Sequence, residues 1–305
     1  PVGRDDSPAL DPRRMSFYGG VEYAQMDDVV RQQAESGILF NATLVRMMIE
    51  NGIHDIPMFR TDGFPEVGAL DGSNFTERLE ECYSKFGRDE TIVITRSNKR
   101  AGRFNESIRR YVLGAEEEIE SGDVLMIVKN NYHYTERDPD SPAGFIANGD
   151  IARLRRLRRV EEFYGFRFAD AVLQLPDYDD YEVECKIMLD TIHSEAPSLT
   201  REQQTRLWRA VEEDYADIPT KAKRYKEIRE NDHFNALQVK FAYAITCHKA
   251  QGGQWSAVFV DKMLFGDETI SRDLLRWLYT AITRATDRLY FVNFDERFFE
   301  NPPEE

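Results

Sequence analysis

The stretch Phe241-Ala-Tyr-Ala-Ile-Thr-Cys-His-Lys-Ala-Gln-Gly-Gly-Gln-Trp255 decides the fold class of this chain. Residues 241–245 predict a buried strand, residues 246–254 a polar, glycine-rich turn, and residues 258–260 a second apolar strand. A strand that ends in Thr, His, Lys, Gln and paired Gly brings donors and bare backbone amides to one sheet edge. Phosphate-bearing ligands are held in this way in α/β proteins. An ordinary β-turn with chance polar residues is the alternative interpretation.

Length and composition limit the classes of protein to which this chain can belong. A chain of 305 residues is long enough for two domains, and its longest apolar runs are too short to cross a membrane. Three widely spaced cysteines form no metal-ligand or disulfide framework, which favours a reducing cytoplasm. The net charge of −15 has the wrong sign for a protein that coats duplex DNA. A locally basic cleft is still compatible with it, because electrostatic steering depends on charge distribution.

Strand and helix patterns on both sides of the opening stretch predict an α/β domain. The β-branched run 91–95 is typical of a buried parallel strand, and a polar turn (96–100) and a helix (103–113) follow it. Apolar spacing predicts further helices over 75–86 and 274–284, the second capped by Ser271. A final strand over 288–292 closes the sheet. Before these elements, a helical pattern starts near Met26 and is broken at Gly37.

The middle of the chain has a different sequence pattern from the segments on either side of it. Short strands over 118–190, with the hairpin dipeptide Asn148-Gly149, predict a small all-β module. The segment that follows, to residue 229, is charged and helical, with Trp208 and Tyr215 as apolar anchors. We therefore predict an α/β domain made of residues 1–117 and 236–305, interrupted by an inserted accessory region over 118–235.

Arg284 is the first candidate catalytic residue. It stands at the end of the apolar helical run 278–285, where it meets the next turn. A buried arginine needs an anionic partner, which is either a structural carboxylate or a ligand phosphate. In the second case it acts as an arginine finger, a guanidinium that stabilises charge building on a γ-phosphate. Arg31, taken alone, is most simply a solvated helix charge.

Several segments resemble, in order, the motifs of superfamily 1 helicases, in particular the RecD/Dda-like branch with its UvrD-like helicase C-terminal domain. Residues 246–252 resemble motif V and residues 278–285 resemble motif VI. Residues 30–38 resemble motif IV, residues 91–100 motif IVa, and residues 1–3 the tail of motif III. The resemblance implies a second RecA-like domain, with helices on both faces of a parallel sheet, and an SH3-like inserted module.

The same resemblance implies two sets of site residues. Arg31 and Arg284 would be catalytic, reaching the γ-phosphate of ATP, with Gly253 and Gln254 beside them as nucleotide-binding residues. Gln254 stands about where many relatives have a Glu that contacts the ribose. The residues implied to contact single-stranded DNA are Thr246, His248, Lys249, Gln251 and Gly252. Hydroxyls and backbone amides suit such sequence-independent sugar-phosphate contacts.

What the sequence lacks shapes the expected mechanism. No G-x-x-x-x-G-K-[ST] motif occurs, and the acidic pair Asp89-Glu90 precedes its strand instead of following it. We expect no metal ligands here, and we expect an N-terminal RecA-like domain to supply most ligands of ATP and Mg²⁺. The expected function is the C-terminal motor half of an ATP-dependent, 5′–3′ DNA helicase, inactive as a fragment. Its expected partners are single-stranded DNA, that N-terminal domain, and nuclease or recombination subunits, with no membrane.

Two alternative functions compete with this one. Pro176-Asp177 with Glu184-Cys-Lys186 fits a loose pattern for metal-assisted phosphodiester cleavage by a nuclease. An adaptor that binds nucleic acid or protein without motor activity is the second alternative. A run of five arginines between 153 and 159 is either a solvated face or a DNA guide along the module.

Overall fold

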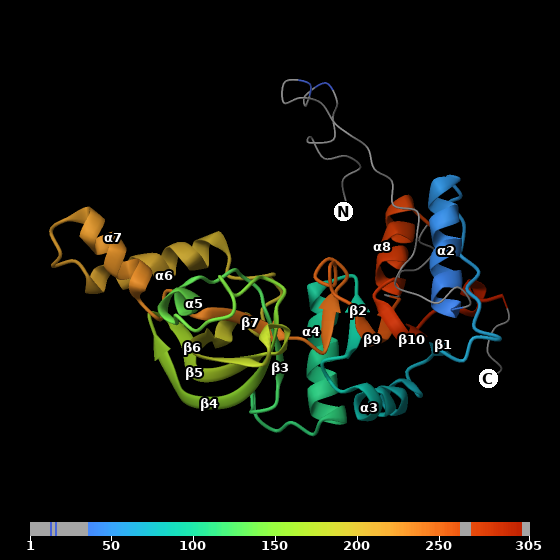
Figure 1. The fold of residues 1–305 in the computed structure, drawn as a ribbon, viewed down its shortest axis with the longest axis horizontal. Coiled ribbons are helices and arrows are strands. Elements are labelled where there is room, and N and C mark those ends of the chain that lie inside the picture. Colours follow the sequence, from blue (N-terminus) through green and yellow to red (C-terminus); the bar gives the residue numbers. More distant parts are fainter. Residues whose placement is uncertain (1–12, 14–15, 17–35, 263–269, 301–305) are drawn as a thin grey trace. The chain divides into compact units, whose positions relative to one another are not determined.

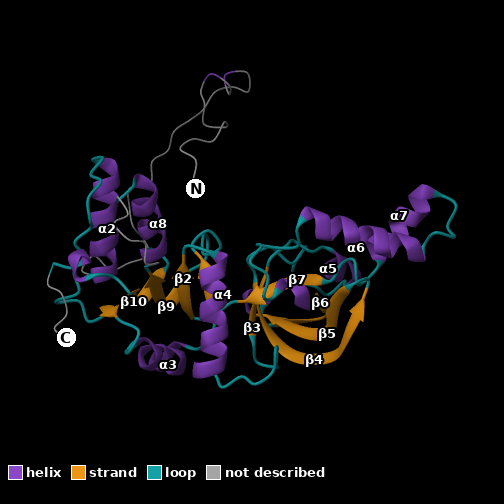
Figure 2. Cartoon of the chain, turned by 180° about the vertical axis from the view of Figure 1, so that it is seen from behind, coloured by secondary structure: helices purple, strands orange, loops and turns teal. Residues whose placement is uncertain are grey.

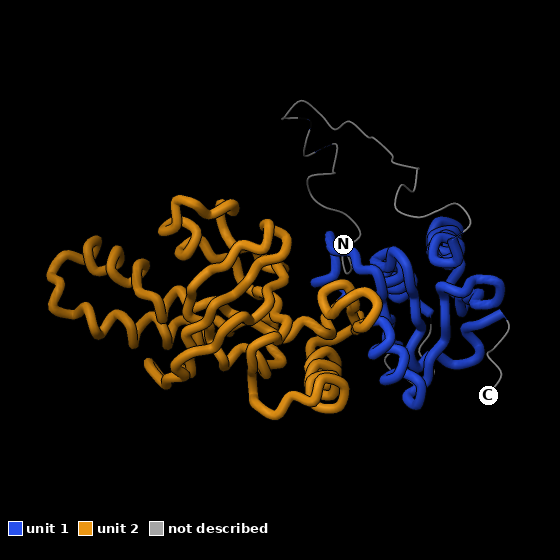
Figure 3. Tube along the Cα trace, turned by 60° about the horizontal axis from the view of Figure 1, so that its bottom comes forward, with its two compact units in different colours: residues 1–82, 247–305 blue, residues 83–246 orange. Residues whose placement is uncertain are grey.

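The computed structural model describes residues 36–262 and 270–300, together with Arg13 and Ser16. The chain forms two compact units, which Figure 3 colours separately. Unit 1 comprises Pro1–Cys82 and Cys247–Glu305, and unit 2 comprises Tyr83–Thr246. The predicted insertion covered only 118–235. Unit 2 is larger because it also holds the strand 91–95 and the helix 98–107 before that segment, and the strands 237–241 and 244–246 after it.

Unit 1 contains three parallel strands. Strand β10 (Ala285–Val292) lies between β1 (Val67–Leu70) and β9 (Trp255–Asp261). Leu289 is in register with Val67 on one side and Val258 on the other. The side chains of β9 are almost continuously buried, as expected for a parallel strand covered on both faces. The predicted parallel sheet is confirmed.

Helices cover both faces of these strands. Helices α2 (Gly37–Glu50) and α8 (Arg272–Ile282) lie side by side on one face (Figure 1; Figure 2). Helix α3 (Phe75–Phe86) lies on the other, where the rings of Phe75 and Phe259 are 5.6 Å apart. The Ser271 hydroxyl caps α8 by accepting from the amide of Leu274 at 3.2 Å, as predicted. A short 3-10 turn, η6 (Glu296–Phe298), follows β10.

Unit 2 begins with its own α/β element. Strand β2 (Thr91–Thr95) runs parallel to β8 (Ala244–Thr246), with Thr95 in register with Thr246. Helix α4 (Asn98–Ser107) follows and continues as the π-helical turn η3 (Ile108–Val112). It starts five residues before the predicted helix, because the Ser97 hydroxyl accepts from the Arg100 amide at 3.2 Å and caps it early.

The remaining strands of unit 2 close into a five-stranded barrel. Neighbouring strands are antiparallel, apart from the parallel contact between β6 and β7, where Ile187 is in register with Leu237. The predicted all-β module is therefore confirmed as a barrel. Its strands are β3 (Val124–Ile127), β4 (Ile151–Phe163), β5 (Phe166–Leu175), β6 (Tyr181–Met188) and β7 (Leu237–Phe241). Short 3-10 turns η4 (Pro176–Tyr178) and η5 (Leu189–Thr191) flank β6.

Two sequence predictions about these strands were wrong. The single strand expected over 241–245 is two strands, because β7 ends at Phe241 inside the barrel and β8 starts at Ala244 beside β2. The hairpin of the barrel also turns elsewhere than at Asn148-Gly149, which forms a turn before β4. It turns at Tyr164 and Gly165, whose φ angles of 52° and 69° suit a two-residue turn between twisted strands.

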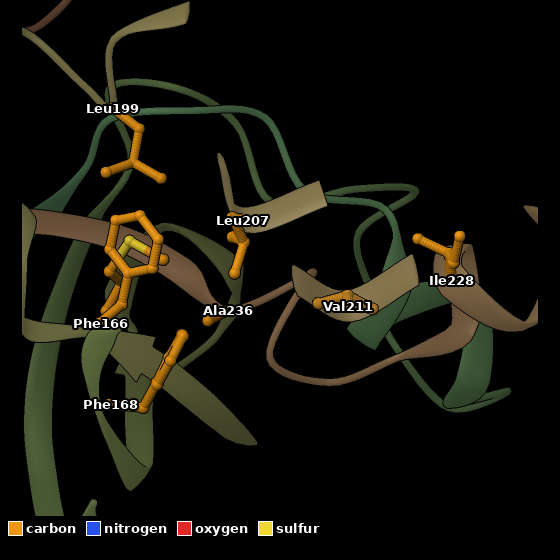
Figure 4. Packing of buried hydrophobic residues seen from close by; sticks show 8 residues of the cluster. Phe166, Phe168, Leu199, Leu207, Val211, Ile228 and Ala236 are labelled. Atoms are coloured by element: carbon orange, nitrogen blue, oxygen red, sulfur yellow. The ribbon is translucent and has the colours of Figure 1, made fainter. Parts of the chain in front are cut away.

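A helical arm packs on the barrel. It consists of α6 (Arg201–Asp214) and α7 (Lys221–Glu230), and a short helix, α5 (His133–Arg137), lies nearby in the same unit. Phe166 and Phe168 of the barrel share a buried cluster with side chains of both arm helices (Figure 4). Trp208 and Tyr215 pack against this cluster, so they are the anchors that the sequence predicted. Among the described residues, no helix is long and apolar enough to cross a bilayer.

Candidate functional site

The turn over 247–254 is the part of unit 1 that the opening stretch predicts. Cys247 and Ala250 are fully buried and anchor it. The Gly253 amide donates to the Ala250 carbonyl at 3.2 Å, and the Gln251 amide donates to the His248 carbonyl at 3.4 Å. These buried residues and backbone hydrogen bonds hold the exposed polar residues of the turn, which we call the rim, in place. The residues of that rim are His248, Gln251, Gly252 and Gln254.

Arg284 joins this turn to the end of α8. Its Nη1 donates to the Gly253 carbonyl at 3.0 Å, and its Nε donates to the Thr280 carbonyl at 3.1 Å. Its Nη2 donates to the Thr283 hydroxyl at 3.2 Å. In return, the Trp255 amide donates to the Arg284 carbonyl at 2.9 Å. The segment that resembles motif VI is therefore in direct contact with Gly253 and Trp255, which follow the segment that resembles motif V, and the half-buried guanidinium is held in one orientation.

Both central glycines of the turn are needed for its shape. Gly252 has a φ of +93°, a conformation that L side chains rarely adopt. A Cβ on Gly253 would lie 2.5 Å from Cη2 of the Trp255 indole. Any larger residue at 253 would therefore displace either Trp255 or the carbonyl that binds Arg284.

Burial shifts the pKa values of two ionisable groups in the turn. Burial raises the pKa of the Cys247 thiol to about 12, and its Sγ lies 3.6 Å from the Trp277 carbonyl as a weak donor. A buried protonated thiol is structural rather than nucleophilic. Burial also lowers the pKa of Lys249. The Cys247 thiol is therefore not a candidate nucleophile.

The Thr246 side of the stretch belongs to unit 2. Thr246 is the last residue of β8, in register with Thr95 at the end of β2. The Thr95 hydroxyl lies 3.1 Å from the Ser97 carbonyl and 3.4 Å from the Ile245 carbonyl. Carboxyl ends of parallel strands meet at one edge of a sheet. Thr246 therefore lies at the same edge as the polar turn over 96–100.

Asn105 is a structural residue that the sequence did not reveal. Its Nδ2 donates to the carbonyls of Phe241 at 3.2 Å and Ala244 at 2.9 Å. Its Oδ1 accepts from the Ala244 amide at 2.8 Å. One amide side chain thus pairs the backbone on both sides of the link between β7 and β8. Its position within helix α4 gave no indication of this distant partner.

A buried ionic cluster lies next to that link. Arg109 donates from Nε and Nη2 to the two carboxylate oxygens of Asp123, at 2.8 and 2.9 Å. The Tyr243 hydroxyl donates to Asp123 Oδ1 at 2.9 Å, and it accepts from the Val124 amide at 3.1 Å. Burial raises the pKa of Tyr243, so its hydroxyl stays protonated. This Arg109–Asp123–Tyr243 cluster fixes the start of the barrel to the residue that precedes β8.

The geometry gives the nuclease alternative no support. The Lys186 ammonium, which the pattern would place beside a metal, lies 2.7 Å from Glu161 Oε1 and 2.6 Å from Asp170 Oδ1. Hydrogen bonds from Lys186 and His233 lower the pKa of Glu161 to about 2, so this network is ionic. Within residues 36–262 and 270–300, no three His, Cys, Asp or Glu side chains are grouped to hold a metal.

The arginine run on β4 is largely paired within unit 2. Arg153 Nε lies 2.6 Å from Asp89 Oδ2, Arg155 Nε lies 3.6 Å from Glu182, and Arg159 Nη2 lies 3.1 Å from Glu161. These pairs favour the solvated face over the DNA guide.

Comparison with protein families now identifies the segment that contains both motifs. Residues 241–292 match the UvrD-like helicase C-terminal domain. The resemblance to superfamily 1 helicases is thereby confirmed for this segment, which runs from the last residue of β7 to the last residue of β10. No curated protein matches the sequence.

Among solved structures, the chain is similar to two Pif1 helicases. The Candida albicans protein has a TM-score of 0.43 and 12% identity, over 90% of this chain and 57% of that one. The Bacteroides protein, solved with ADP-AlF3 and ssDNA, has a TM-score of 0.35 and 12% identity, over 91% and 53%. The chain thus spans little more than half of the length of either helicase.

The predicted site residues fall into three groups. Gly253 and Arg284 are in contact, and Gln254 follows Gly253 on the exposed rim. Residues 248, 249, 251 and 252 share that turn, whereas Thr246 lies at the strand edge of unit 2. Arg31 lies outside the described residues. The roles assigned to all of them stay predictions.

Proposed function

We propose that this chain is the C-terminal motor half of an ATP-dependent DNA helicase of the RecD-like branch, acting in the cytoplasm. The hydrogen bond between Arg284 and the Gly253 carbonyl carries the proposal, because it joins the motif VI segment to the residue directly after the motif V segment, inside the matched segment 241–292. We assign the α/β parts to a second RecA-like domain. We assign the barrel and its helical arm to an SH3-like accessory module.

On the nucleotide side, Arg284 acts as an arginine finger. A guanidinium that is already oriented stabilises the charge of a transferring phosphoryl group without reorganising during the reaction. Arg31 supplies the second finger, and Gly253 and Gln254 lie beside the nucleotide. A Walker-motif domain, which the sequence lacks, holds most of the phosphates and Mg²⁺ of ATP.

On the nucleic-acid side, single-stranded DNA is bound by hydroxyl, imidazole, ammonium and amide donors. The residues proposed for these contacts are Thr246, His248, Lys249, Gln251 and Gly252. Donors of this kind bind the sugar-phosphate backbone and carry no sequence information. The backbone between Thr246 and Gly253 couples the contacts to ATP, since a displacement at Gly253 is transmitted along one short, anchored turn.

Strand separation by the longer protein tests this function. We expect a protein that carries this chain together with a Walker-motif domain to unwind a duplex with a 5′ single-stranded tail, using ATP. A matched duplex with a 3′ tail should be unwound far more slowly, because 5′–3′ translocation is proposed. DNA binding without ATP-dependent unwinding of either substrate would instead support the adaptor alternative.

A further inference from the structure

A groove of about 1020 Å³ opens in unit 2, and none of its lining residues is assigned to the motor. One wall is the segment 129–137, which follows β3 and includes α5, and the other is helix α7. The segment 234–238, which enters β7, completes the lining. All three belong to one compact unit, so the groove is a property of the accessory module alone.

Specific contacts hold the two walls in place. Asp232, just beyond α7, binds His133 Nε2 at 2.9 Å and Arg137 Nη1 at 2.8 Å, both on α5. Arg137 Nη2 also donates to the Glu230 carbonyl at 2.7 Å. The Asn131 side chain donates to the Asn235 carbonyl at 2.7 Å and ties the first wall to the third segment. The groove is therefore preformed, which reduces the ordering cost of binding a ligand.

An exposed aromatic pair lies at the groove. Tyr132 lines it with half of its surface exposed (50%), and the ring of Phe145 stacks against Tyr132 at 5.0 Å between centroids. An antiparallel bridge between Asn131 and Ile146 sets the two rings next to each other. Large aromatic rings left in solvent at a preformed groove are suited to stack on a planar ligand.

The charge of the groove is opposite to that of the chain. Its lining includes four cationic side chains and two carboxylates, whereas the chain has a net charge of −15. Lys226 lies 3.8 Å from Glu230, and Arg137 is held by Asp232. Lys129 and Arg229 have no carboxylate within ion-pair distance among the residues that the structure describes. A locally positive groove on an acidic protein selects an anionic ligand.

We propose that this groove binds single-stranded nucleic acid, with an unstacked base on Tyr132 and backbone phosphates at Lys129 and Arg229. Cations that follow the backbone, together with an aromatic platform, are the combination that holds single strands without sequence preference. A duplex lacks the free base that the platform needs. The proposal adds a second nucleic-acid contact to the proposed function, and it rests on that function only for the class of ligand.

The test is binding of a fluorescein-labelled oligothymidylate of twenty nucleotides, followed by anisotropy with the whole chain and no nucleotide. Tyr132→Ala should weaken binding about five- to 150-fold, the loss of one base stack, whereas Tyr132→Phe keeps the ring and should bind normally. The matched control is Tyr111→Ala, because Tyr111 is 70% exposed on the same unit and lies outside the groove.

The charges are tested by the salt dependence of the same binding. Lys129→Gln with Arg229→Gln should reduce the slope of log affinity against log salt by about 1.4, since each single-strand phosphate contact contributes about 0.7. Lys223→Gln with Arg209→Gln removes two exposed charges from the helical arm outside the groove, and should leave the slope unchanged. A duplex of equal length should bind more weakly than the single strand.

The outcomes separate this proposal from the proposed function. Normal oligothymidylate binding by Tyr132→Ala and by the Lys129 and Arg229 double variant would overturn the proposal that the groove binds single strands. Absence of binding by the unaltered chain would overturn it as well. If Lys249→Gln were the only variant that abolished binding, the groove proposal would be wrong while the motor proposal stood. If the groove variants lost binding while the longer protein never unwound DNA, the groove proposal would hold and the proposed motor function would be wrong.

Discussion

Replacing Arg284 by alanine is expected to lower ATP turnover about 10³- to 10⁵-fold in a protein that joins this chain to a Walker-motif domain. That range is the usual contribution of an arginine finger to phosphoryl transfer. Binding of single-stranded DNA should largely survive, because the proposed DNA contacts are made by Thr246 and by residues 248, 249, 251 and 252 of the turn, not by Arg284. Steady-state ATPase rates and DNA affinity, measured on the same preparation, check both halves of the expectation.

Two further variants make this result specific. Arg284→Lys keeps the charge but loses the planar fork that binds Gly253 and Thr283, so turnover should stay low. Arg288→Ala is the matched control, since Arg288 also donates to a backbone carbonyl, that of Pro65 at 3.2 Å, and lies beyond motif VI. Normal ATP turnover by Arg284→Ala would refute the finger assignment. So would a loss of equal size in Arg288→Ala.

Asp123→Ala is expected to give the largest loss of stability in the accessory module. It leaves the Arg109 guanidinium buried without its carboxylate, and breaking a buried ion pair in this way costs about 3–5 kcal/mol. The Tyr243 hydroxyl loses its acceptor at the same time. Urea unfolding followed by tryptophan fluorescence measures the change in the free energy of unfolding.

The neighbouring arginine is the control for this loss. Arg110 lies on the same π-helical turn as Arg109 but is exposed, so Arg110→Ala should change stability by less than about 0.5 kcal/mol. Replacing both members of the pair, as Arg109→Met with Asp123→Leu, should restore much of the loss because no charge stays buried. A loss below about 1 kcal/mol for Asp123→Ala would show that the cluster contributes little.

Local patterns predicted much of the fold. Residues 75–86 and 91–95 form a helix and a strand over the predicted ranges, because amphipathic spacing and a β-branched run depend on nearby residues alone. Ser271 caps α8 for the same reason. The resemblance assigned Arg284, Gly253 and Gln254 to one nucleotide site, but it did not predict the hydrogen bond between Arg284 and the Gly253 carbonyl.

Distant contacts explain what the sequence did not reveal. The break between β7 and β8 depends on Asn105, more than a hundred residues earlier, which binds the backbone on both sides of the break. Strand β7 joins the barrel through partners in β3 and β6. The hydroxyl of the buried Tyr243 donates to Asp123, which lies 120 residues earlier. No local periodicity encodes such partners, and hydrophobic runs on both sides of a kink read as one strand.

The central claim is that this chain completes an ATP site whose phosphate-binding half lies in another domain. ATP hydrolysis by the purified chain tests it most directly, with and without single-stranded DNA, beside the same chain joined to a Walker-motif domain. We predict no measurable hydrolysis by the chain alone, and DNA-stimulated hydrolysis by the joined protein. Robust hydrolysis by the chain alone, unaffected by Arg284→Ala, would contradict the claim.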